Sequence, residues 1–227
     1  VFYITGSVCL ISGLLVLLFV KDQKVFSEKR QSVKDNLKFS FNNKLISTVI
    51  ISIAVTQMSL SITQPGFVLF IETMIENKEY LSTISGILYG VTGIATAISS
   101  PLWGKRNDRR GVKKSLYIAM AGGAISLVLH TLTYNYFYLI PIRLILGFCI
   151  GGMVPVFYSV ISNNTPDDRK SGIMGIASSF TILGNMTGPL TYSIVSPLFG
   201  LRYVFIFAGL LLFGNIIFIN FRELKIK

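Results

Sequence analysis

Long apolar segments alternate with shorter polar stretches along the whole chain. Each apolar segment is about 19 to 27 residues long, and a helix needs ~20 apolar residues to cross a bilayer. The segments lack the strict alternation of barrel strands and the polar face of soluble helices. The pattern therefore predicts an all-α, polytopic membrane helical bundle with seven transmembrane helices. The predicted spans are Phe2–Val20, Leu45–Ile71, Leu81–Trp103, Val112–Thr133, Tyr136–Ile161, Ile173–Val195 and Tyr203–Phe221.

The spans are unevenly spaced, with one span, then a long polar stretch, then six spans joined by short loops. The polar stretch mixes Lys, Asp, Glu, Ser, Asn and Gln, and we expect one amphipathic helix in it, around Val33–Phe41. A grouping of one plus six indicates the end of one bundle and the whole of another, as in transporters built from two halves. We therefore expect the last span of an N-terminal bundle (1–20), a cytoplasmic central loop (21–44) and a C-terminal six-helix bundle (45–227).

The start of the chain favours a fragment over a complete protein. The chain does not begin with Met, and no basic residue precedes the first apolar segment, which argues against a signal peptide. We expect this segment to be a true span, in a chain cut just before it or inside it.

The composition agrees with a membrane protein. Of the 227 residues, 52% are hydrophobic and only 14% are charged, whereas soluble domains carry about 25% charged residues. These values exclude an ordinary soluble domain and a disordered chain. The formal net charge of +11 raises the question of a nucleic-acid partner, so the position of the basic residues matters.

The basic residues lie almost entirely on one side of the predicted membrane. Of the 21 Lys and Arg, 18 fall in residues 21–44, 104–114 and 167–170 and in the C-terminal tail, against Lys78 and Arg202 on the other side. Cytoplasmic loops carry such an excess of Lys and Arg. We therefore expect a multi-pass protein of the cell membrane with a cytoplasmic C-terminus. The charge is a topology signal that also attracts anionic lipids, and it implies no nucleic-acid partner.

The cytoplasmic stretch between the third and fourth spans combines two glycines, one carboxylate and six cations. Gly104 and Gly111 permit tight turns at two helix ends. Asp108 can accept hydrogen bonds from Arg109 or from a helix N-terminus. Two lysines hold the start of the fourth span at the inner surface. On spacing alone, a short positive-inside turn is the alternative.

This stretch resembles the cytoplasmic loop motif of the major facilitator superfamily, G-x-x-x-D-R-x-G-R/K-R/K. Val112 is one inserted position relative to that motif. The fifth span contains Arg143, Gly147 and Gly151, which resemble the family's intramembrane R-x-x-x-G pattern. In the sixth span, residues 184–189 resemble the G-x-x-x-G-P pattern of drug–proton antiporters. The loop motif is carried by Gly104, Asp108, Arg109, Gly111, Lys113 and Lys114.

The resemblance implies that the chain consists of the sixth span, the central loop and spans seven to twelve of a 12-span transporter. That transporter would be a proton-driven multidrug efflux pump that works by alternating access. The resemblance also implies a bacterial transporter with a role in antibiotic resistance, no cofactor, and a proton gradient as the energy source. The implied partners are the lipid bilayer, a drug-like small molecule and the missing N-terminal half. Since no carboxylate lies deep in a span here, the proton carrier is expected in that half. By the same resemblance, Asp108 bonds a helix N-terminus there. The fragment alone is expected to be inactive.

Several side chains are candidates for the transport pathway. A charge inside a bilayer is costly, so Arg143, roughly 10 Å deep in its span, faces protein or water. Gln57 and Gln64 are seven residues apart and share one helix face, which should point inward. The resemblance implies that Gln57, Gln64, Phe157 and Tyr158 contact the substrate, in a cavity that is mostly apolar and aromatic. Such a cavity suits lipophilic, often cationic drugs. The alternatives are ordinary helix packing for these four and snorkelling for Arg143.

Glycines at helical spacing predict close helix contacts in two spans. Gly188, together with Pro189, is also a candidate hinge for alternating access. The positions are Gly86, Gly90 and Gly93 in the third span, and Gly184 and Gly188 in the sixth.

His130, the only histidine, lies near an outer helix end. We interpret it as a packing residue, with a proton relay as the alternative. Cys9 and Cys149 lie in apolar segments and form neither a disulfide nor a metal site in this interpretation.

Three other functions compete with drug efflux. An uptake carrier for a sugar or small metabolite shares the fold, but it would carry polar and charged side chains along its cavity. A heptahelical receptor has no need of the long linker or of the loop motif. An intramembrane enzyme needs paired Asp, a Ser–His pair or His/Glu metal ligands, and no span contains such a set. We therefore expect a transporter and not an enzyme.

Overall fold

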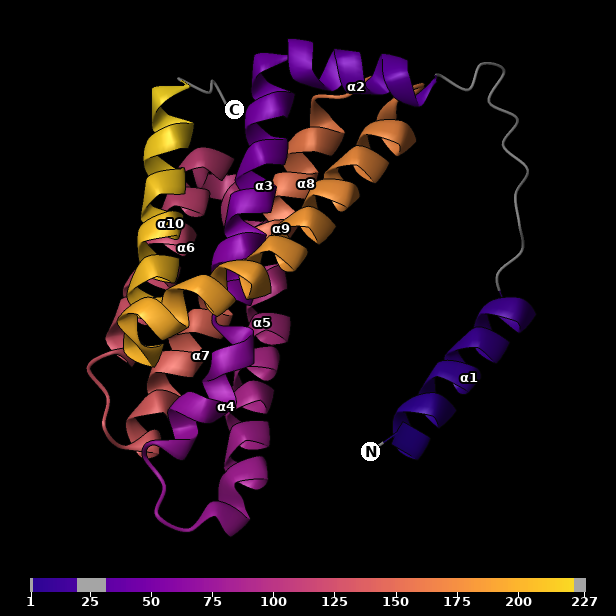
Figure 1. Ribbon diagram of the computed structural model, residues 1–227. Helices are drawn as coiled ribbons and strands as arrows, with labels where there is room; N and C mark the ends of the chain where they lie inside the picture. Colours follow the sequence, from indigo (N-terminus) through magenta and orange to yellow (C-terminus); the bar gives the residue numbers. More distant parts are fainter. Residues whose placement is uncertain (1, 20–31, 223–227) are drawn as a thin grey trace. The chain divides into compact units, whose positions relative to one another are not determined.

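The structure is a computed structural model, and it describes residues 2–19 and 32–222. These residues form α-helices and two short 3₁₀-helices, which confirms the all-α prediction. Residues 1–30 and 31–227 form two separate units, and each is described by itself (Figure 1). Within the helices, the side chains that lie outside the described part are those of Phe2, Ile4, Thr5, Asp108 and Arg110.

The first unit contributes one described helix, α1 (Phe2–Phe19). Its sequence contains no acidic or basic residue, as the first predicted span requires. The part of it with described side chains, Gly6–Phe19, is apolar but shorter than a membrane span. Whether α1 crosses the membrane therefore stays a prediction.

The second unit contains the six remaining predicted spans. Five stretches of its described residues are long and apolar enough to cross a membrane. The sixth, α9, has 30 residues but mixes Ser, Thr, Asn and Gly into its apolar sequence, so the total of seven spans is approximate. The helices are α3 (Lys44–Ile62), α4 (Gln64–Glu72), α5 (Leu81–Arg110), α6 (Val112–His130), α7 (Leu139–Ile150), α8 (Val154–Asn163), α9 (Lys170–Phe199) and α10 (Leu201–Phe221), with 3₁₀-helices η1 (Lys78–Tyr80) and η2 (Tyr136–Tyr138).

Two of the spans are broken helices. The first is interrupted at Thr63 between α3 and α4, and Pro65 lies in the first turn of α4. The second is interrupted between α7 and α8, where Pro155 follows the break. Proline lacks a backbone N–H and clashes with the preceding turn, so it favours the first turn of a new helix over a helix interior. Broken helices frame binding sites in many transporters.

The junction of α5 and α6 differs in part from the prediction. Gly111 has a φ of 83° and separates the two helices, as expected from glycine's access to positive φ. The predicted turn at Gly104 is wrong, because α5 continues through this residue to Arg110. The cations of the predicted loop therefore lie on the last turns of α5 and the first turn of α6. With this length, α5 extends well beyond the predicted span.

The predicted amphipathic helix in the polar stretch is confirmed as α2 (Val33–Asn42). Its polar side packs inward: Asn36 and Ser40 are buried, while Val33 is 72% exposed. The following Asn43 caps α3 by accepting hydrogen bonds from two backbone N–H groups at its start, a favoured role for asparagine. Helix α2 thus belongs with the six-helix unit, and the cytoplasmic location of residues 21–44 stays a prediction.

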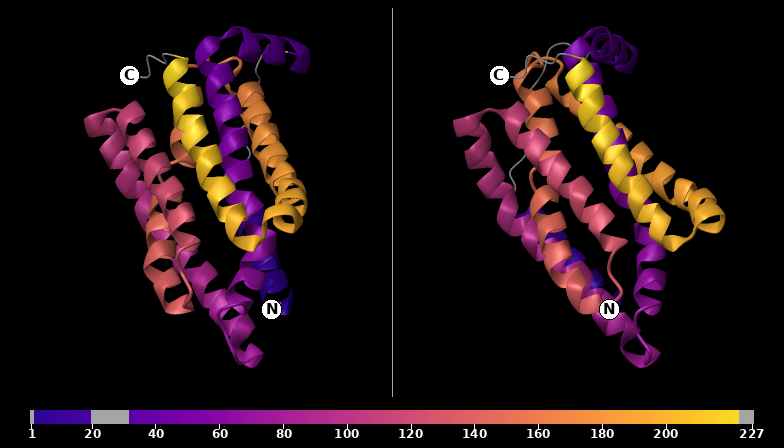
Figure 2. Two further views of the ribbon diagram at one scale, coloured as in Figure 1. Left: turned by 60° about the vertical axis from the view of Figure 1, so that its left-hand side comes forward. Right: turned by 90° about the vertical axis from the view of Figure 1, so that its left-hand side faces the viewer.

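Within this unit, α5, α6 and α7 lie on one side and α3, α9 and α10 on the other (Figure 2). The spans alternate in direction, so the basic segments around α2, the α5–α6 junction, the α8–α9 connection and the end of α10 share one end (Figure 2). Lys78, at the start of η1, and Arg202, in the first turn of α10, lie at the opposite end. The separation of charges expected from the sequence is therefore present in the fold.

Small residues account for the closest helix contacts, but only in part at the predicted positions. A Cβ atom on Gly184 or Gly188 of α9 would collide with the backbone of α3, which confirms the predicted close packing there. The helix is continuous through Pro189. The corresponding prediction for α5 is wrong within this chain, because no atom lies within 4 Å of a Cβ built on Gly86, Gly90 or Gly93.

Candidate functional site

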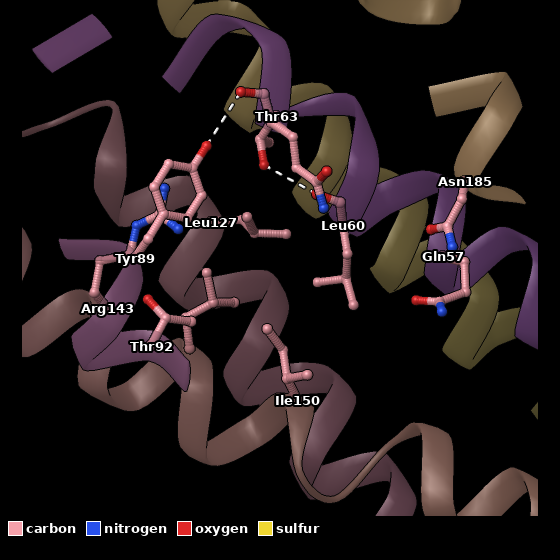
Figure 3. A pocket seen from close by; sticks show the side chains of 11 residues that line it. Gln57, Leu60, Thr63, Tyr89, Thr92, Leu127, Arg143, Ile150 and Asn185 are labelled. Atoms are coloured by element: carbon pink, nitrogen blue, oxygen red, sulfur yellow. Dashed lines mark hydrogen bonds between the residues drawn. The ribbon is translucent and has the colours of Figure 1, made fainter. Parts of the chain in front are cut away.

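A cavity of about 330 Å³ lies between the two groups of three helices (Figure 3). It adjoins the break between α3 and α4, and it has the size of a small-ligand pocket. Its residues come from six helices and from the break itself. They are Gln57, Leu60, Thr63, Gln64, Tyr89, Thr92, Leu127, Arg143, Leu146, Ile150 and Asn185.

The two predicted glutamines and the predicted intramembrane charge meet in this cavity. Gln57 and Gln64 come from α3 and α4, and Arg143 comes from α7. Seven of the eleven lining residues carry a polar side chain, and Tyr89 is the one aromatic residue among them. The cavity therefore contains more polar and fewer aromatic residues than expected. The added polar residues belong to stripes at helical spacing, a signal in the sequence that could have found them. The stripes are Ser85, Tyr89, Thr92 and Thr96 on α5, and Ser178, Thr181 and Asn185 on α9.

Arg143 is the only charged side chain among the lining residues. Its residue is 6% exposed, and its guanidinium carbon lies 3.3 Å from the ring centroid of Phe67 and 5.5 Å from that of Tyr89. These rings attract the cation through their negative faces. Its Nε atom is buried and has no hydrogen-bond partner among the described residues. The side chain therefore faces protein and cavity, and it does not snorkel to the surface.

Tyr89 connects the two sides of the cavity. Its hydroxyl donates a hydrogen bond of 3.2 Å to the backbone carbonyl of Gln64 (Figure 3), so α5 is tied to the start of α4. The ring of Tyr89 also packs edge-on against Phe67, at 5.0 Å between centroids. Phe67, Tyr89 and Arg143 thus form one contiguous group at the α4 side of the cavity.

Two amide side chains occupy the opposite end of the cavity. Gln57 of α3 and Asn185 of α9 lie next to each other there, away from Arg143 (Figure 3). Leucine and isoleucine side chains line the cavity between the two ends, from Leu60, Leu127, Leu146 and Ile150. The order along the cavity is a cation, a middle lined by leucine and isoleucine side chains together with Thr63, and a pair of amides (Figure 3).

The two predicted aromatic contacts lie elsewhere. Phe157 is fully buried in the core formed with residues of α3 and α9. Tyr158 is partly buried, and its hydroxyl lies 3.0 Å from the hydroxyl of Thr181 on α9. Neither residue lines the cavity. Both residues lie on α8, beyond the break that ends α7, and α8 contributes no residue to the cavity lining.

The glycines that follow Arg143 pack against α5 and leave no room for a cavity. A Cβ atom on Gly147 would collide with the carbonyl oxygen of Thr92, and one on Gly151 with the hydroxyl of Ser99. Thr96 also donates a hydrogen bond of 3.0 Å to the carbonyl of Gly147. These contacts fix the position of α7 along α5, and they therefore also fix the position of Arg143 relative to α5.

The loop motif lies at the basic end of the unit, away from the cavity. Arg109 is exposed, and the lysines at the start of α6 are at least partly exposed. Lys113 lies over the ring of Tyr117, at 5.7 Å from its centroid. The side chain of Asp108 lies outside the described part, so its bonding to a helix N-terminus stays a prediction.

His130 is enclosed by aromatic rings at the end of α6. It is fully buried and stacks on Phe205, with centroids 5.1 Å apart and planes 5° apart. Its Nδ1 atom lies 2.7 Å from the carbonyl oxygen of Ser126. This environment agrees with the packing interpretation of His130.

Replacing His130 by phenylalanine is therefore expected to leave transport by the full-length protein and its pH profile unchanged. Phenylalanine keeps the stacked ring and removes a buried Nε2 atom that has no partner among the described residues. Transport assays across a range of external pH values provide the measurement. A shifted pH profile in this variant would instead support the proton-relay alternative.

The long apolar helices, two of them broken, define a polytopic α-helical membrane protein with a cavity between its helices. Residues 49–225 match the Major Facilitator Superfamily, and the chain belongs to this family. Among its relatives are multidrug resistance proteins MdtG, which are 28% identical in Rahnella sp. (strain Y9602) and 30% identical in Proteus mirabilis (strain HI4320). These alignments cover 95% and 98% of the chain but 53% and 56% of the relatives. The chain thus spans about half the length of the relatives that it matches.

Proposed function

We propose that this chain forms the C-terminal half of a secondary active exporter of lipophilic drugs, driven by proton antiport. Membership in a transporter family and the names of its relatives support the assignment. The observation that carries it is the cavity of about 330 Å³, with leucine and isoleucine side chains in its middle and hydrogen-bonding groups at both ends. Such a site holds an apolar body and orients it through few polar contacts.

In this proposal, the chain supplies one wall of the transport pathway. Helix α5 exposes most of its apolar length, since only 11% of its most apolar 18-residue stretch is buried. We assign its exposed face, with Gly86, Gly90 and Gly93, to contact with the other half of the transporter. None of the lining residues is a carboxylate, which agrees with a proton carrier in that other half. The positive-inside rule orients the C-terminus toward the cytoplasm.

Import of a small polar metabolite is the second candidate. The polar character of seven of the eleven lining residues favours it, because a polar solute needs a hydrogen-bond partner for each group that it loses to water. Import and export differ in the direction of net flux. Vesicles of both orientations, loaded and energised separately, distinguish the two.

The full-length protein in cells without other pumps is expected to export ethidium or norfloxacin, and a proton uncoupler should stop this export. Proton antiport predicts this result, because downhill proton entry is the energy source. Fluorescence of each drug in energised cells provides the measurement, with vector-only cells as the control. Export that continues after the gradient collapses would contradict proton antiport.

A further inference from the structure

We propose that Arg143 binds an anionic group, specifically a carboxylate, of the transported molecule. The inference rests on the proposed transport function and adds a charge preference to it. It differs from the cationic preference expected from the sequence, because the one charged side chain on this wall is itself a cation.

The first argument is the missing counter-charge. Arg143 forms no ion pair among the described residues, although only 6% of it is exposed. The carboxylates of Glu72 and Asp167 pair with lysines at the ends of the bundle. A buried guanidinium without a negative partner is costly, so an anion in contact with it recovers much of that cost.

The second argument is how the guanidinium is held. One of its faces rests on Phe67, at 3.3 Å from the centroid, and Tyr89 flanks it at 5.5 Å. The N–H donors of a guanidinium lie in its own plane, so a ring on its face leaves them free to match the two oxygens of a carboxylate. Tyr89 uses its hydroxyl proton on the carbonyl of Gln64. The aromatic contacts therefore position the cation without occupying its donors.

The third argument is the order of groups along the cavity. Beyond Arg143 come the apolar side chains of Leu60 and Leu127, and then the amides of Gln57 and Asn185 (Figure 3). The matching ligand has a carboxylate at one end, a flat or compact apolar body and a hydrogen-bonding group at the other end. A cavity of about 330 Å³ admits a molecule of this kind.

The competing explanation is a carboxylate from the other half of the transporter. In that case Arg143 would serve every substrate alike, because the ion pair would belong to the protein. A comparison of substrates that differ in one negative charge separates the two explanations. Norfloxacin and its methyl ester differ in this way, and ethidium is a permanent cation without a carboxylate.

The experiment uses the full-length transporter with Arg143→Gln, which removes the charge, and Arg143→Lys, which keeps it. Arg202→Gln is the matched control, because Arg202 bonds the carbonyl of Thr131 at a helix end outside the cavity. Export is measured for all three compounds in cells. Binding of norfloxacin and its ester is measured on the purified protein, and membrane abundance is recorded for each variant.

We expect the unmodified protein to bind norfloxacin about tenfold more tightly than its ester, as one charge-assisted contact implies. Arg143→Gln should abolish this preference and reduce norfloxacin export, while ethidium export continues. Arg143→Lys should retain the preference in part, and Arg202→Gln should retain it fully.

Two results would overturn the anion site. One is equal binding of acid and ester by the unmodified protein, and the other is equal loss of all three compounds in Arg143→Gln at normal abundance. If the unmodified protein exports none of the compounds but still prefers the acid in binding, the drug-export assignment fails and the anion site stands.

Discussion

Gly184→Ala is expected to remove most of the full-length transporter from the membrane. A Cβ atom at this position would lie 2.8 Å from Cβ of Gln57, and it would collide with the carbonyl oxygen of Ala54. The backbone of α3 cannot move aside locally, so α9 must shift as a whole. Overpacking of this kind costs ~1–3 kcal/mol or more, and close backbone approach is a main source of helix association in membranes.

Gly175→Ala is the matched control for this change. It lies on the same helix, and no atom lies within 4 Å of its Cβ position. Alanine there should be neutral or slightly stabilising, because alanine favours helix more than glycine does. Abundance in membranes and the unfolding temperature of the purified protein provide the measurements. Equal behaviour of the two variants would show that the α3–α9 contact does not limit stability.

Trp103→Ala is expected to detach the basic end of α5 from α7. The residue is 4% exposed, and its indole Nε1 donates a hydrogen bond of 2.8 Å to the carbonyl of Phe148. Its ring also lies against Gly152, where a Cβ atom would approach to 2.6 Å. Truncating a buried tryptophan costs ~3–5 kcal/mol. Helix α5 keeps its other contacts with α7, at Thr96 and Ser99, so the loss is expected at the basic end of α5 and not along its whole length.

Limited trypsin digestion measures this detachment directly, because the end of α5 and the start of α6 carry six basic residues. Trp103→Ala should accelerate cleavage there, and Trp103→Phe should do so less, since it loses the hydrogen bond but keeps a ring. Leu102→Ala is the control, because Leu102 is 49% exposed. Unchanged cleavage in Trp103→Ala would mean that other contacts hold this end of α5.

The prolines inside the predicted spans show what the sequence alone could predict about helix breaks. Prolines 65 and 155 lie inside predicted spans, and both occur just after a break in the helix. Helix α5 contains Pro101 and remains unbroken. The chemistry of proline is the same at all three positions, so packing against neighbouring helices decides whether a span breaks.

Arg143, Gly147 and Gly151 show the same difference between what the sequence indicates and what the tertiary structure decides. These three residues are spaced four apart, which places them near one another on one side of a helix. Only the tertiary structure shows that the glycines meet α5, whereas Arg143, one turn earlier, reaches the cavity. A face of a helix curves around its axis, so residues at the same spacing meet different neighbours.

The apolar pattern and the separation of charges are local properties, and they sufficed to predict an all-helical membrane protein and its α2 helix. The loop motif, carried by Gly104, Asp108 and their neighbours, sufficed to indicate the family. The composition of the cavity was decided by tertiary structure alone. Tyr89 and Asn185 are far apart in sequence, and a polar stripe on a single helix does not say which other helix it meets. Only the packing of α5 and α9 around the α3–α4 break brings them to the same cavity as Arg143.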